Sequence, residues 1–183
     1  PITEMVLEAP GGLIHIRAEC RNGKAQSITV QNLPSFVGDV GVTLNVPGLG
    51  KLIVDTAYGG DTFVIVDADA LGFMLDTPEA GRLAELGMRI TQAANEQLSF
   101  HHPENAEWHH FSFCLFAGPL ERKGSSLRTK AAVAIRPGKI DRSPTGTALS
   151  ARMALLHQTG QMDIGETITA RSIIGSEFHG TIS

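Results

Sequence analysis

The residues with the clearest chemical potential lie in one short segment, residues 141–148, with the sequence DRSPTGTA. Pro144 favours the start of a helix, and Gly146 lets a ligand approach the backbone without a side chain in the way. The first amide N–H groups of a helix have no acceptor within it, and the helix dipole adds partial positive charge at that end. The segment therefore predicts an anion site that suits a carboxylate.

Such a site suits chemistry at the carbon next to a carboxylate. When that carbon loses a proton, negative charge moves onto the carboxylate oxygens, where preorganised N–H donors stabilise it. An ordinary helix start, capped by Ser143 or Thr145, explains the same residues without any ligand. The local pattern alone favours this simpler alternative.

Composition narrows the function classes. The chain has 183 residues, a formal charge of −4 and 42% hydrophobic residues, as expected of one globular domain with its own core. The scattered Lys and Arg residues argue against a nucleic-acid partner, and no apolar run approaches the roughly 20 residues of a membrane span. Cys20 and Cys114 lie far apart without metal-ligand spacing, which predicts a cytoplasmic protein with neither disulfide nor zinc.

The first third of the chain predicts a β-meander, because apolar and polar residues alternate with period two. Asn22-Gly23 is a strong hairpin signal, and short turns between the later strands predict antiparallel neighbours. The expected strands cover residues 5–9, 13–20, 25–32, 40–46, 51–57 and 62–67.

The remainder predicts two helices and four more strands. Thr77-Pro78 marks the start of a helix from about Pro78 to Leu98, with Thr77 as its N-cap. A second helix is expected from near Pro144 to Gly160, and it is apolar on almost every side, which is typical of a buried helix. The other strands are expected at residues 111–117, 128–135, 166–173 and 176–182. We predict an α+β domain, a mostly antiparallel, barrel-like sheet wrapped around a central helix.

The histidines at positions 101, 102, 109 and 110 fall in the predicted loop that follows the first helix. They have no metal-binding spacing, so we interpret them as solvated loop residues. Trp108, in the same loop, is interpreted as a packing or interface residue.

Five ordered motifs resemble segments of the proline racemase family, which includes hydroxyproline epimerases and trans-3-hydroxy-L-proline dehydratases. They are Asn32–Phe36, Val46–Gly50, Asp55–Gly60, Asp141–Thr147 with its continuation Ser150–Ala154, and Arg171–Ser176. The resemblance extends over essentially the whole chain. It implies one of two similar lobes, each a β-barrel around a central helix as in diaminopimelate epimerase, with the active site in the cleft between the lobes.

The resemblance also implies that part of the catalytic machinery lies elsewhere. The family's first catalytic residue belongs to a Met-Cys-Gly-His-like stretch, and neither Cys20 nor Cys114 has such neighbours. We therefore expect residues 1–183 to form a single lobe of a longer enzyme, with the first catalytic motif in the other lobe.

Thr145 occupies the position of the family's second catalytic cysteine. Racemases and epimerases of the family resemble one another in using two opposed thiols, whereas an aliphatic hydroxyl is too weak an acid to serve as a base. Cysteine followed by threonine resembles the trans-3-hydroxy-L-proline dehydratases. The resemblance thus implies removal of the α-proton and loss of the 3-hydroxyl, giving a pyrroline-2-carboxylate without metal or redox cofactor. Thr145 is expected at the reacting face, bonded to the departing hydroxyl or to a water.

The family match implies the substrate contacts as well. Asp141 is expected at the ring nitrogen, and Gly146 and Thr147 are expected to donate backbone N–H groups to the carboxylate. Gly60 and Asp61 are expected beside the cleft. Both aspartates are also explained as turn residues that bond nearby backbone.

Two other functions stay open. The nearer is a proline racemase or a 4-hydroxyproline 2-epimerase, and the more distant is a non-catalytic protein that binds proline-like amino acids. In each case the expected partner is a small cyclic amino acid, with no nucleic acid and no membrane. A homodimer also stays open.

Overall fold

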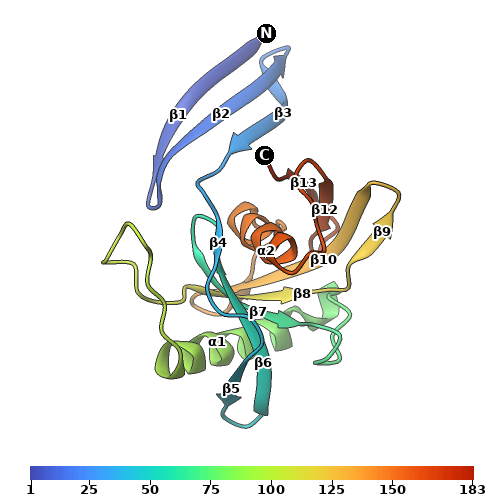
Figure 1. Ribbon diagram of the computed structural model, residues 1–183. Coiled ribbons are helices and arrows are strands. Elements are labelled where there is room, and N and C mark those ends of the chain that lie inside the picture. Colours follow the sequence, from blue (N-terminus) through green and yellow to red (C-terminus); the bar gives the residue numbers. More distant parts are fainter.

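The computed structural model describes residues 1–183, which form two separate sheets and two α-helices. A three-stranded antiparallel sheet projects from the body of the molecule (Figure 1). Its strands are β1 (Ile2–Ala9), β2 (Gly12–Arg21) and β3 (Lys24–Gln31). Asn22 and Gly23 both have positive φ in the β2–β3 turn, which confirms the hairpin that the Asn-Gly pair predicts.

The second sheet has ten strands, with the main order β13-β12-β10-β8-β7-β6-β4 and three strands that branch from it. The strands are β4 (Phe36–Val37), β5 (Val42–Val46), β6 (Gly50–Tyr58), β7 (Thr62–Asp67), β8 (Phe113–Ala117), β9 (Glu121–Lys123), β10 (Ser126–Ile135), β11 (Lys139–Ile140), β12 (Thr167–Arg171) and β13 (Glu177–Thr181). Most neighbours are antiparallel, but the β7–β8 and β10–β12 pairs are parallel. The sequence did not predict β4, β9 and β11, because two or three residues are too few to show period-two alternation.

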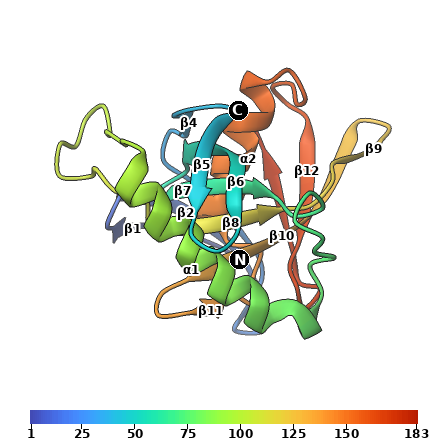
Figure 2. The same ribbon diagram turned by 90° about the horizontal axis from the view of Figure 1, so that it is seen from below.

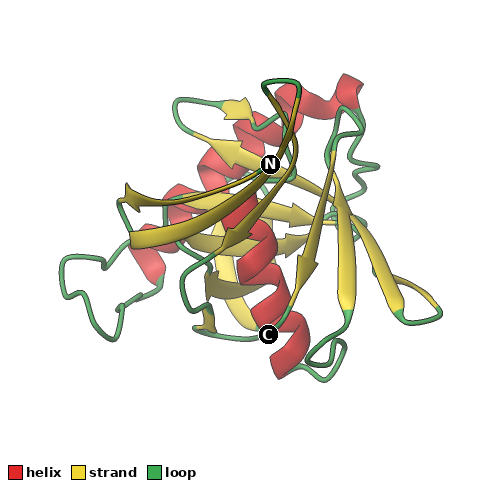
Figure 3. Ribbon diagram, turned by 90° about the horizontal axis from the view of Figure 1, so that it is seen from above, coloured by secondary structure: helices red, strands yellow, loops and turns green.

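The two helices lie on opposite faces of this sheet. α1 (Ala80–Gln97) crosses the outer face, as the view from below shows (Figure 2). α2 (Gly146–Gln158) lies on the inner face, with strands of the curled sheet around it (Figure 3). The predicted α+β fold, a mostly antiparallel sheet curled around a central helix, is therefore confirmed. Neither helix combines the length and the apolar character that crossing a membrane requires.

β7 shows how one strand serves both faces. Phe63 and Ile65 pack in the apolar cluster beside α2, whereas Val64 and Val66 pack in the larger cluster beside α1. Successive side chains of a strand point to opposite faces, so a strand between two helices is apolar at each position that the helices cover, here residues 63–66. One face of the sheet thus packs against the central helix α2, and the opposite face packs against α1.

Two helix starts differ from the sequence prediction. Asp76, not Thr77, precedes the first helical turn, and the Thr77 hydroxyl donates to the carbonyl of Ile173 instead of capping the helix. α2 begins at Gly146 and not at Pro144, because Thr145 has the non-helical angles φ 63° and ψ 104°. Gly160 follows α2 with φ 71°, as expected of a glycine that ends a helix.

Candidate active site

The amino-terminal end of α2 reaches the surface of the body. Gly146 is exposed, and Thr145 and Thr147 are half-buried. The first helical hydrogen bond runs from the Leu149 N–H to the Thr145 carbonyl at 2.9 Å, and no side chain caps the helix. The N–H groups of Gly146, Thr147 and Ala148 therefore have no acceptor within α2. Together with the helix dipole they form a donor set that fits a carboxylate.

Three residues before α2 form a closed hydrogen-bond network. The Thr145 hydroxyl donates to Asp141 Oδ2 at 2.6 Å, and the Ser143 hydroxyl donates to the same oxygen at 3.1 Å. The Ser143 N–H donates to Asp141 Oδ1 at 2.9 Å, and the Thr145 N–H donates to Ser143 Oγ at 3.1 Å. Asp141 is therefore a turn residue that bonds backbone two residues on, and it is also the acceptor for Thr145.

Thr145 has an unfavourable backbone conformation for a β-branched residue. Its φ of 63° and ψ of 104° lie outside the main allowed regions, and such a conformation costs on the order of 1–3 kcal/mol. The hydrogen bonds to Ser143 and Asp141 hold it there. Since a hydroxyl has one proton, the Thr145 proton is committed to Asp141, and only its lone pairs are left for another group.

The β6–β7 turn rests directly on the first turns of α2. A Cβ atom at Gly59 would lie 2.2 Å from the Thr147 carbonyl oxygen and 2.4 Å from the Ala151 nitrogen, so only glycine fits there. Gly60 has φ 97°, and a Cβ atom there would lie 3.1 Å from Thr147 Cγ2. Gly60 and Thr147, which the sequence places 87 positions apart, are thus neighbours.

Asp61 closes the same turn. Its Oδ1 accepts the Thr62 N–H at 2.7 Å, and its carbonyl accepts the Gly59 N–H at 2.9 Å. These bonds are the ones expected of an aspartate that serves only as a turn residue. The carboxylate also acts on Tyr58, whose pKa is raised first by desolvation of the phenol and then by the negative charge of Asp61. No hydrogen bond joins Asp61 to the Asp141–Ser143–Thr145 network.

The loop between α1 and β8 packs against β6. The His102 ring meets Tyr58 edge-on with centroids 4.7 Å apart, and Trp108 meets Tyr58 at 5.5 Å. His102 is half-buried, so the expectation that it is solvated is wrong; Tyr58 and Phe36 provide aromatic surfaces for its ring. The other three histidines of the loop are exposed, and Trp108 is confirmed as a packing residue. No three His, Cys, Asp or Glu side chains are arranged to hold a metal ion.

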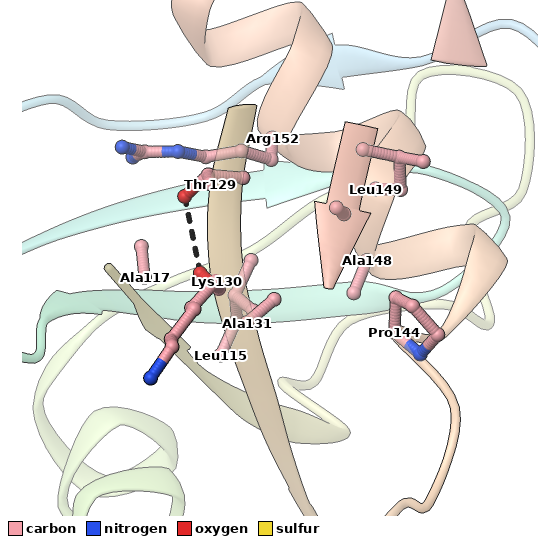
Figure 4. A pocket seen from close by; sticks show the side chains of 10 residues that line it. Leu115, Ala117, Thr129, Lys130, Ala131, Pro144, Ala148, Leu149 and Arg152 are labelled. Atoms are coloured by element: carbon pink, nitrogen blue, oxygen red, sulfur yellow. Dashed lines mark hydrogen bonds between the residues drawn. The ribbon is translucent and has the colours of Figure 1, made fainter. Parts of the chain in front are cut away.

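Arg152 is a desolvated cation on α2, in the stretch Ser150–Ala154, and the sequence pattern assigned it no role. Burial lowers the pKa of its guanidinium, and the charges of Asp55 and Asp67 partly oppose that effect. Its Nε has no hydrogen-bond partner. Arg152 lines a cavity of about 10 Å³ beside α2 (Figure 4). Since a single water needs roughly 10–15 Å³, this cavity has no room for a ligand the size of an amino acid.

Comparisons with known proteins agree with this architecture. A sequence model of the family described as proline racemase matches residues 1–183. A probable proline racemase from Agrobacterium radiobacter K84, solved with bound carbonate, superposes with a TM-score of 0.87 at 32% identity over 98% of this chain. A hydroxyproline epimerase from Agrobacterium vitis, solved with bound trans-4-OH-L-proline, gives 0.87 at 33% identity over 98% of this chain. The chain spans 52% and 50% of these two relatives, about half the length of each.

Proposed function

The chain belongs to the proline racemase family, and from this premise we propose that it forms one lobe of a trans-3-hydroxy-L-proline dehydratase. The substrate carboxylate binds the N–H groups of Gly146 and Thr147, and the ring nitrogen faces Asp141. Gly60 and Asp61 border the same space. The thiol that removes the α-proton belongs to a second lobe outside residues 1–183. The main support is Thr145, which the sequence resemblance aligns with the second thiol and whose hydroxyl donates its proton to Asp141 at 2.6 Å.

Inversion of the α-carbon requires a proton from the face opposite to the one that lost it. A thiol is acidic enough to alternate between donor and base near neutral pH, whereas an aliphatic hydroxyl is not. In Thr145 the single hydroxyl proton is also engaged by Asp141. Thr145 therefore supplies no proton to the deprotonated substrate, and loss of the 3-hydroxyl becomes the favoured outcome.

The stereochemistry of the substrate defines the role of Thr145 more closely. In trans-3-hydroxy-L-proline the hydroxyl is trans to the carboxylate, so it lies on the same ring face as the α-hydrogen. The thiol that takes the α-proton then lies on the face of the departing hydroxyl, and Thr145 lies on the other face. We therefore assign Thr145 the role of preventing reprotonation, in place of the expected bond to the departing hydroxyl.

One acid–base group is sufficient for this elimination. The thiolate takes the α-proton, the C–H electrons form the ring double bond, and the bond from C3 to oxygen breaks. The thiol then gives the same proton to the departing oxygen, which leaves as water, and the thiolate is restored. The enamine product tautomerises to a pyrroline-2-carboxylate. The amides of Gly146 and Thr147 stabilise the charge that collects on the carboxylate before the hydroxyl leaves.

The test compares three hydroxyprolines with the enzyme that contains both lobes. We expect water loss from trans-3-hydroxy-L-proline to be about 100-fold faster than from the cis-3 isomer, which corresponds to ~2.7 kcal/mol in barrier height. Faster dehydration of the cis-3 isomer would contradict a mechanism in which the α-proton and the 3-hydroxyl leave from the same ring face. Epimerisation of trans-4-hydroxy-L-proline at a rate that rivals dehydration would reject the dehydratase.

The second candidate is a hydroxyproline 2-epimerase, because one structural relative is described as a hydroxyproline epimerase with bound trans-4-OH-L-proline. That function needs a proton donor on the Thr145 face, such as a water held by the lone pairs of the hydroxyl. A protein that binds proline-like amino acids without turnover is the remaining alternative. Calorimetric binding of L-proline without α-proton exchange in D2O would identify it.

A further inference from the structure

Asn32 joins three separate segments beside the candidate site. It lies just after β3, in the stretch that connects the projecting sheet to the body. Its Nδ2 donates to the carbonyl of Gly59 at 2.7 Å and to the hydroxyl of Ser150 at 2.8 Å. Gly59 belongs to the β6–β7 turn and Ser150 to α2. One side chain thus connects the linker, the turn and the central helix.

The partners of Asn32 fix the orientation of its carboxamide. A carbonyl oxygen only accepts hydrogen bonds, so the atom 2.7 Å from the Gly59 oxygen must be the amide nitrogen. Both protons of that nitrogen are then in use. The other atom, Oδ1, lies 3.2 Å from the place where a Cβ of Gly60 would be, and the Thr147 methyl carbon lies 3.1 Å from the same place. No hydrogen bond from the protein reaches Oδ1.

The Asn32 bonds are the only hydrogen-bonded link between the β6–β7 turn and α2. The close packing of Gly59 on the helix backbone limits how near the turn can come. It does not prevent the turn from moving away. Asn32 supplies the attraction, because it donates to a turn carbonyl and to a helix side chain at the same time.

We propose that Asn32 is a positioning residue for the substrate. By holding the β6–β7 turn against α2, it sets the width of the space beside the N–H groups of Gly146 and Thr147. The inference rests on the proposed site at the start of α2, but it holds for whichever cyclic amino acid reacts there. Loss of the Asn32 donors widens this space, so the substrate binds less tightly while the reacting groups stay in place.

The test is Asn32→Asp in the enzyme with both lobes. This change keeps the size of the side chain but replaces the two donors by a carboxylate oxygen that faces the Gly59 carbonyl. Asn45→Asp is the matched control, because Asn45 is exposed on β5 and its side chain makes no hydrogen bond. KM and kcat are measured for α-proton exchange in D2O with trans-3-hydroxy-L-proline, L-proline and trans-4-hydroxy-L-proline, and melting temperatures are recorded for every variant.

We expect Asn32→Asp to raise KM about tenfold and to change kcat by less than about threefold, with both values unchanged in Asn45→Asp. Unchanged KM in Asn32→Asp overturns the proposal, and so does an equal rise in the control. If Asn32→Asp does not fold, Ser150→Ala decides, since it removes one acceptor only: a KM rise of about threefold supports the proposal, and no rise overturns it. The proposed dehydration is judged separately by the product formed, so the two failures are distinguishable.

Discussion

Gly59→Ala probes the packing that brings the β6–β7 turn to the start of α2. The added Cβ would lie 2.2 Å and 2.4 Å from two backbone atoms of the helix, the Thr147 oxygen and the Ala151 nitrogen. These atoms are four residues apart, the spacing of a helical N–H to C=O hydrogen bond. The methyl group would therefore push into a hydrogen-bonded turn of α2, where neither neighbour is a flexible side chain.

The expected magnitude follows from that contact. Overpacking costs about 1–3 kcal/mol, and a weakened helical hydrogen bond adds about 1 kcal/mol, so the free energy of unfolding should fall by about 2–4 kcal/mol. For a chain of this size each kcal/mol lowers Tm by about 2–4 °C, which predicts a fall of about 4–16 °C. Because the turn must move away from α2, KM for the substrate should rise as well.

Gly81→Ala is the matched control. A Cβ at Gly81 meets no atom within 4 Å, and the residue lies in α1. The same substitution should therefore stabilise the protein by about 0.5–1 kcal/mol, because alanine is the better helix former. Urea and thermal denaturation followed by circular dichroism measure both variants. A change of less than about 0.5 kcal/mol in Gly59→Ala would refute the argument that the turn packs directly on the helix backbone.

Three further predictions concern single side chains. Thr145→Cys in the enzyme with both lobes should introduce inversion at the α-carbon, because a thiol can deliver a proton to the ring face where the hydroxyl supplies none. Chiral chromatography detects the epimer. Retention of configuration alone would show that residue 145 does not face the substrate. Burial raises the pKa of the Cys114 thiol well above its usual range, so iodoacetamide should alkylate native protein at the half-exposed Cys20 and not at Cys114. Equal labelling of the two cysteines, measured by mass spectrometry, would contradict the buried position of Cys114. The pKa of Glu166 is lowered from its ordinary 4.5, chiefly by the hydrogen bond from Arg122 and next by the hydrogen bond from the Asp163 N–H. The ionised carboxylate therefore stabilises the folded protein at neutral pH. This stabilisation is lost as the pH falls through the lowered pKa. Glu166→Gln should thus reduce the free energy of unfolding at pH 7 and differ progressively less from the parent protein below pH 4.5, and a difference that is constant with pH would refute the assignment.

The sequence predicted those parts of the fold that depend on local pattern. The hairpin at Asn22-Gly23, the helix that became α1 and the burial of α2 follow from turn chemistry and periodicity. The start of α2 was not predictable in this way. Thr145 takes a positive φ because side chains two and four positions earlier hold it, and periodicity contains no information about such bonds.

The same distinction between local pattern and long-range packing applies to the candidate site. Asp141, Thr145 and Gly146 lie in one segment, so their proximity could be predicted from the sequence alone. The contact of Gly60 with Thr147 depends on long-range packing, for which the Gly59-Gly60 pair was only a hint. The partners of Asn32 are 27 and 118 residues away, so its role needs the three-dimensional structure.

The central claim is that backbone amides at the start of α2 hold the substrate carboxylate. L-Proline tests it directly, because it has the ring and the carboxylate of the proposed substrate but no 3-hydroxyl to lose. In the ¹⁵N-labelled enzyme with both lobes, we predict that L-proline shifts the amide signals of Gly146, Thr147 and Ala148 along a single saturating curve. Saturation of binding by calorimetry with these three signals unmoved would contradict the account.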